Sequence, residues 1–262
     1  MQKILVILGP TATGKSELAV KLARKYNGEI ISADSRQVYI GLDIGTGKIT
    51  KKEMRGVVHY MLNVVSPNGS TGSPHGKFTV VQWKRQAEKI IEEIISRGKL
   101  PIICGGTGFY IQSIVDGMVL PEVPPNYALR KRLGKVRPSQ LFKMLKKIDS
   151  EKAKTIDREN PVRLIRAIEI AMVLGQVPTL GQTQGKNSYE FLQIGLKLTD
   201  KKLRRKIHDR VLTRMKKGMV KEAQNLHKSG LSWKRMRELG LEYRFLADYL
   251  ENKISKPELI RK

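Results

Sequence analysis

Eight residues near the amino terminus have the types and spacing of a phosphate-binding loop. They follow a continuous apolar run and precede a segment with helical spacing, and they are Gly9, Pro10, Thr11, Ala12, Thr13, Gly14, Lys15 and Ser16. In such a loop the glycines let backbone N–H groups close around phosphate oxygens, and the helix N-terminus adds its positive end. Lys15 would neutralise phosphate charge, and the Ser16 hydroxyl would be available to Mg²⁺. The motif predicts phosphate binding without specifying a reaction.

Two further polar segments directly follow predicted strands. Asp34 comes after the second strand, and residues 105–108 (Gly-Gly-Thr-Gly) come after a later one. Ligands of open α/β sheets bind at the carboxyl edge of the strands, so we expect both segments beside the phosphate loop. The Asp34 carboxylate could hold Mg²⁺, accept a proton from a nucleophile or cap a helix. Thr107 could contact a substrate or belong to a tight turn.

The elements that must position these residues alternate between strand and helix in the first half of the chain. In chain order they are strand 3–8, helix 17–25, strand 29–32, strand 60–65, helix 80–97 and strand 101–104. Strands that are apolar throughout are typical of parallel sheets covered on both faces. The alternation therefore predicts a doubly wound α/β layer. Residues 66–77, rich in Gly, Ser and Pro, are expected to form a loop.

The pattern changes after Gly117. Residues 120–125 are interrupted by prolines, and the segments that follow have helical spacing until an apolar run at 189–198. We interpret 120–188 as a small helical insertion domain and 189–198 as a strand that returns to the sheet. The predicted core domain then consists of residues 1–119 and 189–262.

One long amphipathic helix is expected from Asp200 to about His227. Its apolar positions, nearly four residues apart, are Leu203, Ile207, Val211, Met215, Met219, Ala223 and Leu226. Its other faces carry nine basic residues: Lys201, Lys202, Arg204, Arg205, Lys206, Arg210, Arg214, Lys216 and Lys217.

Positive charge is the unusual feature of the composition. The 262 residues include 50 Lys and Arg against 24 Asp and Glu, a net charge of +26. Residues 120–262 contain 34 of those basic residues. Such an excess points to a polyanionic partner, although a solvated basic surface with no partner is the alternative.

The remaining composition is that of a folded globular protein. Hydrophobic residues make up 40% of the chain, and its single cysteine, Cys104, excludes an internal disulfide framework and a thiolate zinc cluster. No apolar run approaches the roughly 20 residues that span a bilayer. We therefore expect a cytoplasmic protein without membrane attachment, and a monomer.

Several motifs together resemble one family, the tRNA dimethylallyltransferases, also called tRNA isopentenyltransferases. Besides the phosphate loop they are residues 34–39 (Asp-Ser-Arg-Gln-Val-Tyr), 43–46 (Asp-Ile-Gly-Thr), Lys48, 105–110 (Gly-Gly-Thr-Gly-Phe-Tyr) and 160–169 (Asn-Pro-Val-Arg-Leu-Ile-Arg-Ala-Ile-Glu). The resemblance covers most of the chain. It implies a P-loop NTPase-like parallel sheet that carries a helical insertion.

The resemblance also implies a reaction, the transfer of a dimethylallyl group from dimethylallyl diphosphate to N6 of the adenosine 3′ of the anticodon in tRNA. Residues 9–16 correspond to the diphosphate site, with Mg²⁺ at Ser16. Asp34 corresponds to the general base for N6, Thr107 to a residue that holds the adenine, and Arg210 to an arginine on the diphosphate. The adenosine must leave its stack to react, at a cost of roughly a few kcal/mol.

The same resemblance assigns positions that contact the tRNA anticodon stem-loop. They are Asp34, Ser35, Arg36, Gln37, Thr107, Arg130, Arg163, Arg166 and Arg237. The helix around 162–166 also has apolar positions, Leu164, Ile168 and Met172, that are expected in a core. Within it, only Arg163 and Arg166 are therefore candidates for RNA contact.

This sequence departs from the family pattern at three places. Residues 58–60 are Val-His-Tyr where the family usually has Pro-His-His. The insertion is abbreviated around 133–137, and the sequence ends at Lys262, before the basic helix that normally closes these enzymes. Because of the abbreviated insertion and the absent basic helix, we expect this protein to bind RNA more weakly than typical members of the family.

Three other functions remain as alternatives at the level of sequence. A kinase of a small metabolite would use ATP and Lys15 for phosphoryl transfer, which the charge and the set of motifs disfavour. Prenylation of free AMP or ADP would not need a basic second half. An RNA-binding module with a vestigial nucleotide fold would not need Lys15, Ser16 and Asp34.

Overall fold

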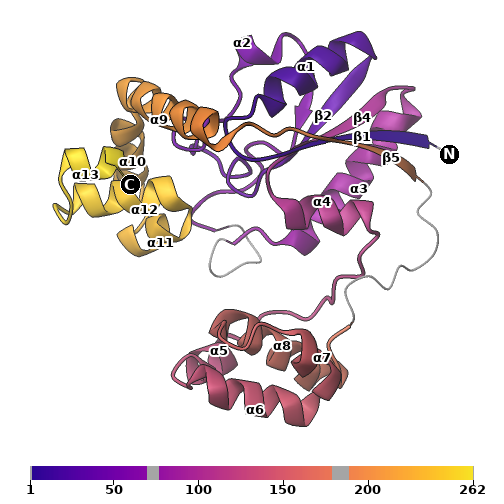
Figure 1. The fold of residues 1–262 in the computed structure, drawn as a ribbon, viewed down its shortest axis with the longest axis vertical. Coiled ribbons are helices and arrows are strands. Elements are labelled where there is room, and N and C mark those ends of the chain that lie inside the picture. Colours follow the sequence, from indigo (N-terminus) through magenta and orange to yellow (C-terminus); the bar gives the residue numbers. More distant parts are fainter. Residues whose placement is uncertain (1, 70–76, 179–188, 262) are drawn as a thin grey trace. The chain divides into compact units, whose positions relative to one another are not determined.

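The computed structural model describes residues 2–69, 77–178 and 189–261. It divides the chain into two compact units, Met1–Val115 with Ser188–Lys262, and Asp116–Asn187. The larger unit contains the sheet, whereas the described part of the smaller unit is helical (Figure 1). The inserted unit thus begins at Asp116, slightly before the boundary at residue 120 that the sequence suggested.

Five parallel strands form one sheet in the order β3-β2-β4-β1-β5. They are β1 (Gln2–Leu8), β2 (Gly28–Ala33), β3 (His59–Tyr60), β4 (Leu100–Gly105) and β5 (Tyr189–Gly195). The register pairs Leu8 with Gly105 and Ala33 with Gly105, so the central strands end level with one another. The predicted fold class, a parallel α/β sheet of the P-loop type, is confirmed.

Apolar residues cover both faces of the sheet, as continuous apolar strands require. In β1, Ile4 and Val6 belong to the core with α3 (Val80–Ser96) and α4 (Gly108–Val115), while Leu5 and Ile7 belong to the core with α1 (Lys15–Lys25). Figure 1 shows α1 on one side of the strands and α3 and α4 on the other. Because alternate side chains of a strand point to opposite faces, one apolar run supplies both cores.

Five helices at the carboxyl end extend the core that α3 and α4 cover. They are α9 (Asp200–Lys216), α10 (Met219–Lys228), α11 (Trp233–Glu238), α12 (Leu241–Leu250) and α13 (Lys256–Arg261). Met219, Tyr243 and Leu246 are buried in the same cluster as Ile4 and Val6. In the described part of the chain, no helix combines the length and the hydropathy that a bilayer crossing requires.

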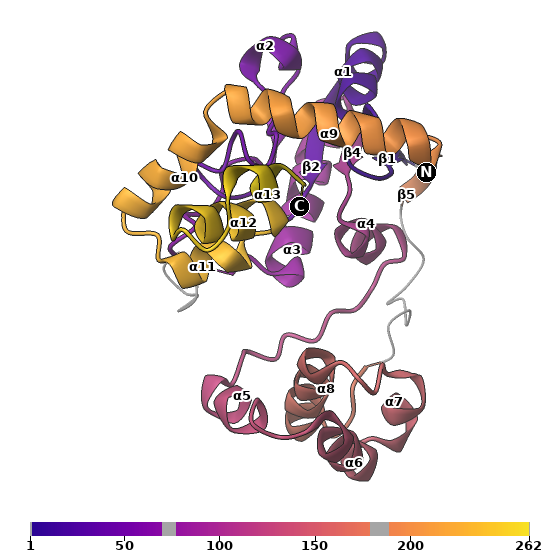
Figure 2. The same ribbon diagram turned by 60° about the vertical axis from the view of Figure 1, so that its left-hand side comes forward.

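The prediction of one helix over residues 200–227 was wrong in two respects. The chain turns at Gly218, which has a φ of 96° and separates α9 from α10 (Figure 2). A left-handed residue ends the α-helical hydrogen-bond pattern, and glycine adopts that conformation without a Cβ clash. The predicted apolar and basic faces of the helix are also incorrect at two positions, because Arg214 is buried and Ile207 is exposed.

Two other segments differ from the sequence expectation. The strand predicted over 60–65 is reduced to β3, because Met61 and Asn63 have φ values of 62° and 56° that interrupt extended backbone. Val64 and Val65 instead donate backbone hydrogen bonds to the carbonyl oxygen of Val38. Of the loop expected at 66–77, residues 70–76 lie outside the described residues.

In the described part of the smaller unit, residues 116–178, four helices pack around an apolar core. They are α5 (Tyr127–Leu133), α6 (Pro138–Ile148), α7 (Ser150–Thr155) and α8 (Pro161–Leu174). Asn126, Asp149 and Asn160 cap three of them through side-chain hydrogen bonds to the first turn. Leu164 and Ile168 of α8 lie in the core as predicted, whereas Met172 is 56% exposed near the end of that helix.

Glu29, near the amino end of β2, is a buried carboxylate that pairs with two partly exposed cations. Its carboxylate accepts hydrogen bonds from Lys99 Nζ at 2.6 Å and from both Arg97 Nη2 and Tyr60 Oη at 2.7 Å. Burial alone would raise the pKa of Glu29, but these hydrogen bonds outweigh it and hold the pKa below its ordinary value.

Replacing Glu29 with glutamine should therefore destabilise the protein in a pH-dependent way. We expect Glu29→Gln to lower the free energy of unfolding by about 1–3 kcal/mol at pH 7, the scale of lost hydrogen bonds to a charged group. A depressed carboxyl pKa stabilises the fold above the unfolded value of about 4.3, and this contribution is lost as pH falls through the folded value. Urea unfolding of both proteins at pH 7 and pH 3 measures the difference. A difference that is equal at both pH values would contradict the assignment.

Candidate active site

The phosphate loop, residues 9–16, connects β1 to α1 in a closely packed conformation. Gly9 has a φ of 146°, and a Cβ there would overlap the carbonyl oxygen of Leu196, so only glycine fits. Lys15 Nζ and Thr13 Oγ1 both donate to the carbonyl oxygen of Pro10, at 2.5 and 2.9 Å. The ammonium of Lys15 is thereby held at the loop itself, where the amino end of α1 already favours an anion.

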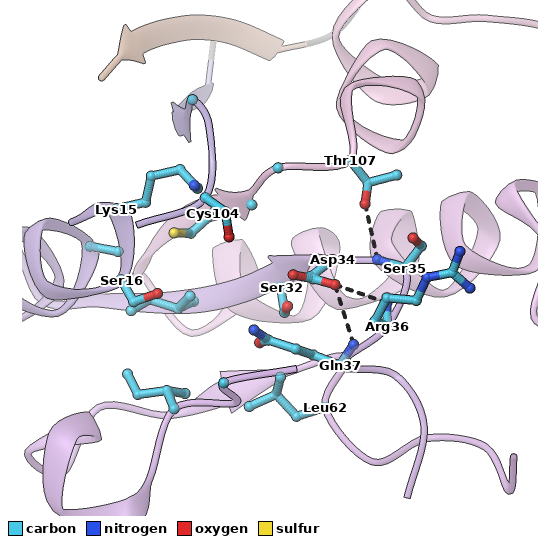
Figure 3. A pocket seen from close by; sticks show the side chains of 18 of the residues that line it. Lys15, Ser16, Ser32, Asp34, Ser35, Arg36, Gln37, Leu62, Cys104 and Thr107 are labelled. Atoms are coloured by element: carbon cyan, nitrogen blue, oxygen red, sulfur yellow. Dashed lines mark hydrogen bonds between the residues drawn. The ribbon is translucent and has the colours of Figure 1, made fainter. Parts of the chain in front are cut away.

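Asp34 follows the last residue of β2 and keeps one carboxylate oxygen free. Its Oδ1 accepts hydrogen bonds from the backbone N–H groups of Arg36 and Gln37, at 2.8 and 3.3 Å (Figure 3). Among the described residues, no donor contacts Oδ2. Asp34 therefore caps the following turn through Oδ1, and these two hydrogen bonds fix the carboxylate. Its Oδ2 stays available for proton transfer.

Thr107 is joined to the same turn from the neighbouring strand. Its Oγ1 accepts a hydrogen bond of 3.0 Å from the backbone N–H of Ser35, and its own N–H donates to the carbonyl oxygen of Ala33. Gly105 allows this contact, because a Cβ there would overlap the backbone of Ala33. Since Oγ1 acts as an acceptor toward Ser35, the hydroxyl proton of Thr107 can be donated to a ligand.

Arg210 reaches the phosphate loop from α9. Its Nη1 lies 3.4 Å from Thr11 Oγ1, and its Nη2 lies 3.3 Å from the carbonyl oxygen of Thr46. Burial lowers the pKa of Arg210, and the carboxylates of Glu242 and Asp34 oppose this effect. A guanidinium that has lost part of its hydration gains more from an anion than an exposed one does.

These side chains line one cavity of about 300 Å³. The polar part of its wall includes Lys15, Ser16, Asp34, Ser35, Arg36, Gln37, Thr107 and Arg210, and the apolar part includes Ala19, Ile30, Ile49 and Leu62. Burial lowers the pKa of Lys15. The positive charge of Arg210 adds to this lowering, and the Asp34 carboxylate opposes it. The cavity therefore presents two desolvated cations near one carboxylate with a free oxygen. Such a site can hold an anionic leaving group and accept a proton from a nucleophile.

A divalent cation would need ligands from a bound substrate at this site. The described residues contain no group of three or more His, Cys, Asp or Glu side chains that could hold a metal. Ser16 and Asp34 nevertheless line the same cavity as the phosphate loop. Mg²⁺ is commonly bound by one or two protein oxygens, several waters and substrate phosphates, so these donors fit it when a diphosphate is present.

Several arginines expected at an RNA surface are engaged within the protein. In the smaller unit, Arg130 and Arg166 both pair with the buried carboxylate of Glu169. Arg237 pairs with Asp248 at 2.8 Å and with Glu251. Their contact with RNA stays a prediction.

Two other arginines expected to contact RNA differ in their surroundings. Arg36 Nη1 donates to the carbonyl oxygen of Glu238 at 3.2 Å. Arg163 is exposed, and its Nη1 lies 3.8 Å from Oδ2 of Asp157. Of the five arginines expected to contact RNA, Arg163 is held least tightly by the protein.

Comparison with known families agrees with this geometry. The family described as IPP transferase matches residues 37–262, and the one described as isopentenyl transferase matches residues 2–69. The chain belongs to the IPP transferase family. A tRNA dimethylallyltransferase 2 of Treponema denticola is 42% identical over 97% of this chain and 83% of its own length.

Solved structures give the same result for the fold. The tRNA delta(2)-isopentenylpyrophosphate transferase of Staphylococcus epidermidis is 34% identical with a TM-score of 0.67, over 100% of this chain and 84% of that one. The full-length tRNA isopentenylpyrophosphate transferase of Bacillus halodurans is 33% identical with a TM-score of 0.68, over 100% and 81%.

Sequence reasoning missed two parts of the site's surroundings. Arg214, expected on a basic face of the helix away from its apolar positions, is buried, donates to the carbonyl oxygen of Gly45 at 2.9 Å and has a pKa lowered by burial to about 10. Its position three residues after the apolar Val211, on the same face of the helix, was a signal of burial. Glu222 and its bonds to residues 43–45 gave no signal, because the partners are separated by more than 170 residues.

Removing the loop ammonium should weaken binding of an anion. We expect Lys15→Ala to raise the Kd for inorganic diphosphate by about 10- to 100-fold, the loss of one charge-assisted contact. Isothermal titration calorimetry measures this value. Arg24→Ala, which removes one exposed charge from the same helix, is the matched control. Equal affinities of Lys15→Ala and the parent protein would show that this loop does not hold the diphosphate.

Proposed function

We propose that this protein transfers the dimethylallyl group of dimethylallyl diphosphate to N6 of the adenosine 3′ of the anticodon in tRNA. The cavity that sets Asp34 against Lys15 and Arg210 is the observation that carries this proposal. The names of the relatives support the substrates, since the proteins from Treponema denticola and Staphylococcus epidermidis are described as tRNA prenylating enzymes.

The donor half of the reaction uses the phosphate loop and the two cations. As the bond between C1 and the diphosphate oxygen breaks, negative charge accumulates on the leaving diphosphate. Lys15, Arg210 and the N–H groups at the start of α1 are already oriented in a partly buried site, so they stabilise this charge with little reorganisation. No phosphoryl group moves, and diphosphate is released.

The acceptor half uses Asp34 and Thr107. N6 of adenine is a weak nucleophile because its lone pair is delocalised into the ring, so alignment with C1 must lower much of the barrier. When the N6–C1 bond forms, one N6 proton passes to Oδ2 of Asp34. The Thr107 hydroxyl can donate a hydrogen bond to the base, which would orient the adenine beside that oxygen.

Mg²⁺ would be held by the Ser16 hydroxyl together with diphosphate oxygens and water. When bound, it would neutralise part of the diphosphate charge. Ser16 is exposed at the start of α1, so its hydroxyl is accessible to a metal that arrives with the substrate. Asp34 would then remain free for the proton.

Binding of tRNA would use the exposed basic residues, because the adenosine must be extruded at a cost of roughly a few kcal/mol. On α9 the side chains of Lys201, Lys202, Arg204 and Arg205 are all exposed. Contacts between such side chains and phosphates release counterions from the RNA and supply affinity that does not depend on sequence. Arg163 in the smaller unit is a further candidate contact.

The direct test offers labelled dimethylallyl diphosphate and two acceptors, an anticodon stem-loop and free AMP. We expect label in the stem-loop, with kcat/KM higher than for AMP by about 10² or more, because remote contacts position N6 against C1. A stem-loop with guanosine at the target position lacks the N6 amine and should remain unlabelled.

Variants separate the two halves of this proposal. Arg210→Ala should slow both acceptors by similar factors, whereas Arg163→Ala should affect the stem-loop alone. Preferential labelling of AMP would contradict the tRNA assignment. Phosphorylation of a small molecule by ATP without prenyl transfer would favour a kinase instead.

A further inference from the structure

A single carboxylate holds the loop that contacts Arg210. Glu222 of α10 accepts backbone hydrogen bonds from Asp43 at 3.0 Å and Ile44 at 2.7 Å on Oε2, and from Gly45 at 2.9 Å on Oε1. Tyr243 Oη donates a fourth hydrogen bond to Oε1, at 2.6 Å. Three consecutive N–H groups that converge on one anion form a backbone nest, so Glu222 fixes the course of the chain there.

The carbonyl groups of the same loop orient two arginines. Thr46 accepts from Arg210 Nη2 at 3.3 Å, and Gly45 accepts from Arg214 Nη1 at 2.9 Å. Among the described residues, Arg210 also donates a hydrogen bond to Thr11 Oγ1, which is long at 3.4 Å. The loop at residues 43–47 therefore contributes to positioning the guanidinium of Arg210 beside the phosphate loop.

Close packing limits how the loop can respond when its anchor is lost. A Cβ on Gly47 would overlap the guanidinium groups of Arg210 and Arg214, and a Cβ on Gly45 would lie 2.6 Å from Tyr243 Oη. The loop already lies against these side chains, so it cannot move toward them. If residues 43–45 shifted after the loss of Glu222, the carbonyl of Thr46 would therefore move away from Arg210.

Glu222 does not line the catalytic cavity. We propose that Glu222 is a positioning residue for the reaction: its carboxylate fixes the loop at residues 43–47, and that loop holds Arg210 in place for the diphosphate. This inference rests on the proposed function, in which Arg210 binds the leaving group. It assigns a role in donor binding to an acidic residue that contacts neither substrate.

The test measures the Kd of inorganic diphosphate by calorimetry on the full chain for four proteins: the parent, Glu222→Gln, Arg210→Ala and the double variant. The amide of Gln would point an N–H group at the loop's own N–H donors. We expect Glu222→Gln to weaken diphosphate binding by about tenfold, within the range for coupled residues. In the Arg210→Ala background the same substitution should cause no further loss.

Glu29→Gln is the matched control. It makes the same chemical change at a buried carboxylate of the same unit, near the amino end of β2, that does not line the cavity. It should lower thermal stability and leave the Kd for diphosphate unchanged, which separates positioning from general destabilisation.

Glu222→Asp gives a second measurement that retains the charge if the amide variant fails to fold. Its shorter side chain reaches fewer of the three N–H groups, so we expect diphosphate binding a few-fold weaker, again with no effect when Arg210 is alanine. Parent-like affinity in a folded Glu222 variant, or losses that multiply in the double variant, would overturn the inference. A parent protein that does not bind diphosphate would overturn the proposed function itself, and this inference with it.

Discussion

The close approach of three parallel strands at their carboxyl ends is the constraint on which the site depends. Leu8, Ala33 and Gly105 lie level in the sheet, so the segments after β1, β2 and β4 must share one small volume. Glycine at positions 9 and 105 makes this approach possible, since a Cβ at either would overlap neighbouring backbone. The phosphate loop, Asp34 and Thr107 consequently meet at this edge of the sheet.

The carboxyl-terminal helices add what the sheet edge lacks, a second cation. Lys15 comes with the phosphate loop, whereas Arg210 comes from α9 and depends on a loop that α10 and α12 secure. Both cations are partly desolvated; Asp34 offsets part of the charge of each, and Glu242 also acts on Arg210. The arrangement separates the site into a cationic part for a leaving group and a carboxylate oxygen for a proton.

The sheet and its edge could be predicted from the sequence because they follow from local patterns. The apolar runs at 3–8 and 101–104 set the strands, and Asp34 and Thr107 were found because they follow strands directly. The break at Gly218 was missed because the four-residue apolar spacing continues through it. Glu222 could not be found, because its bonds to residues 43–45 exist only once α10 packs against the core. The ion pairs of Arg130 likewise depend on the folded position of Glu169, and no local pattern reveals them.

The most direct test of this account is the single-turnover rate of prenyl transfer to a tRNA stem-loop by Asp34→Asn. Asparagine retains the shape and can still accept the backbone hydrogen bonds of Arg36 and Gln37, but it cannot take the N6 proton. We expect a rate lower by about 10²–10⁴, with the Kd for diphosphate unchanged. A rate close to that of the parent protein would contradict it and would leave Asp34 as a residue that only caps the turn.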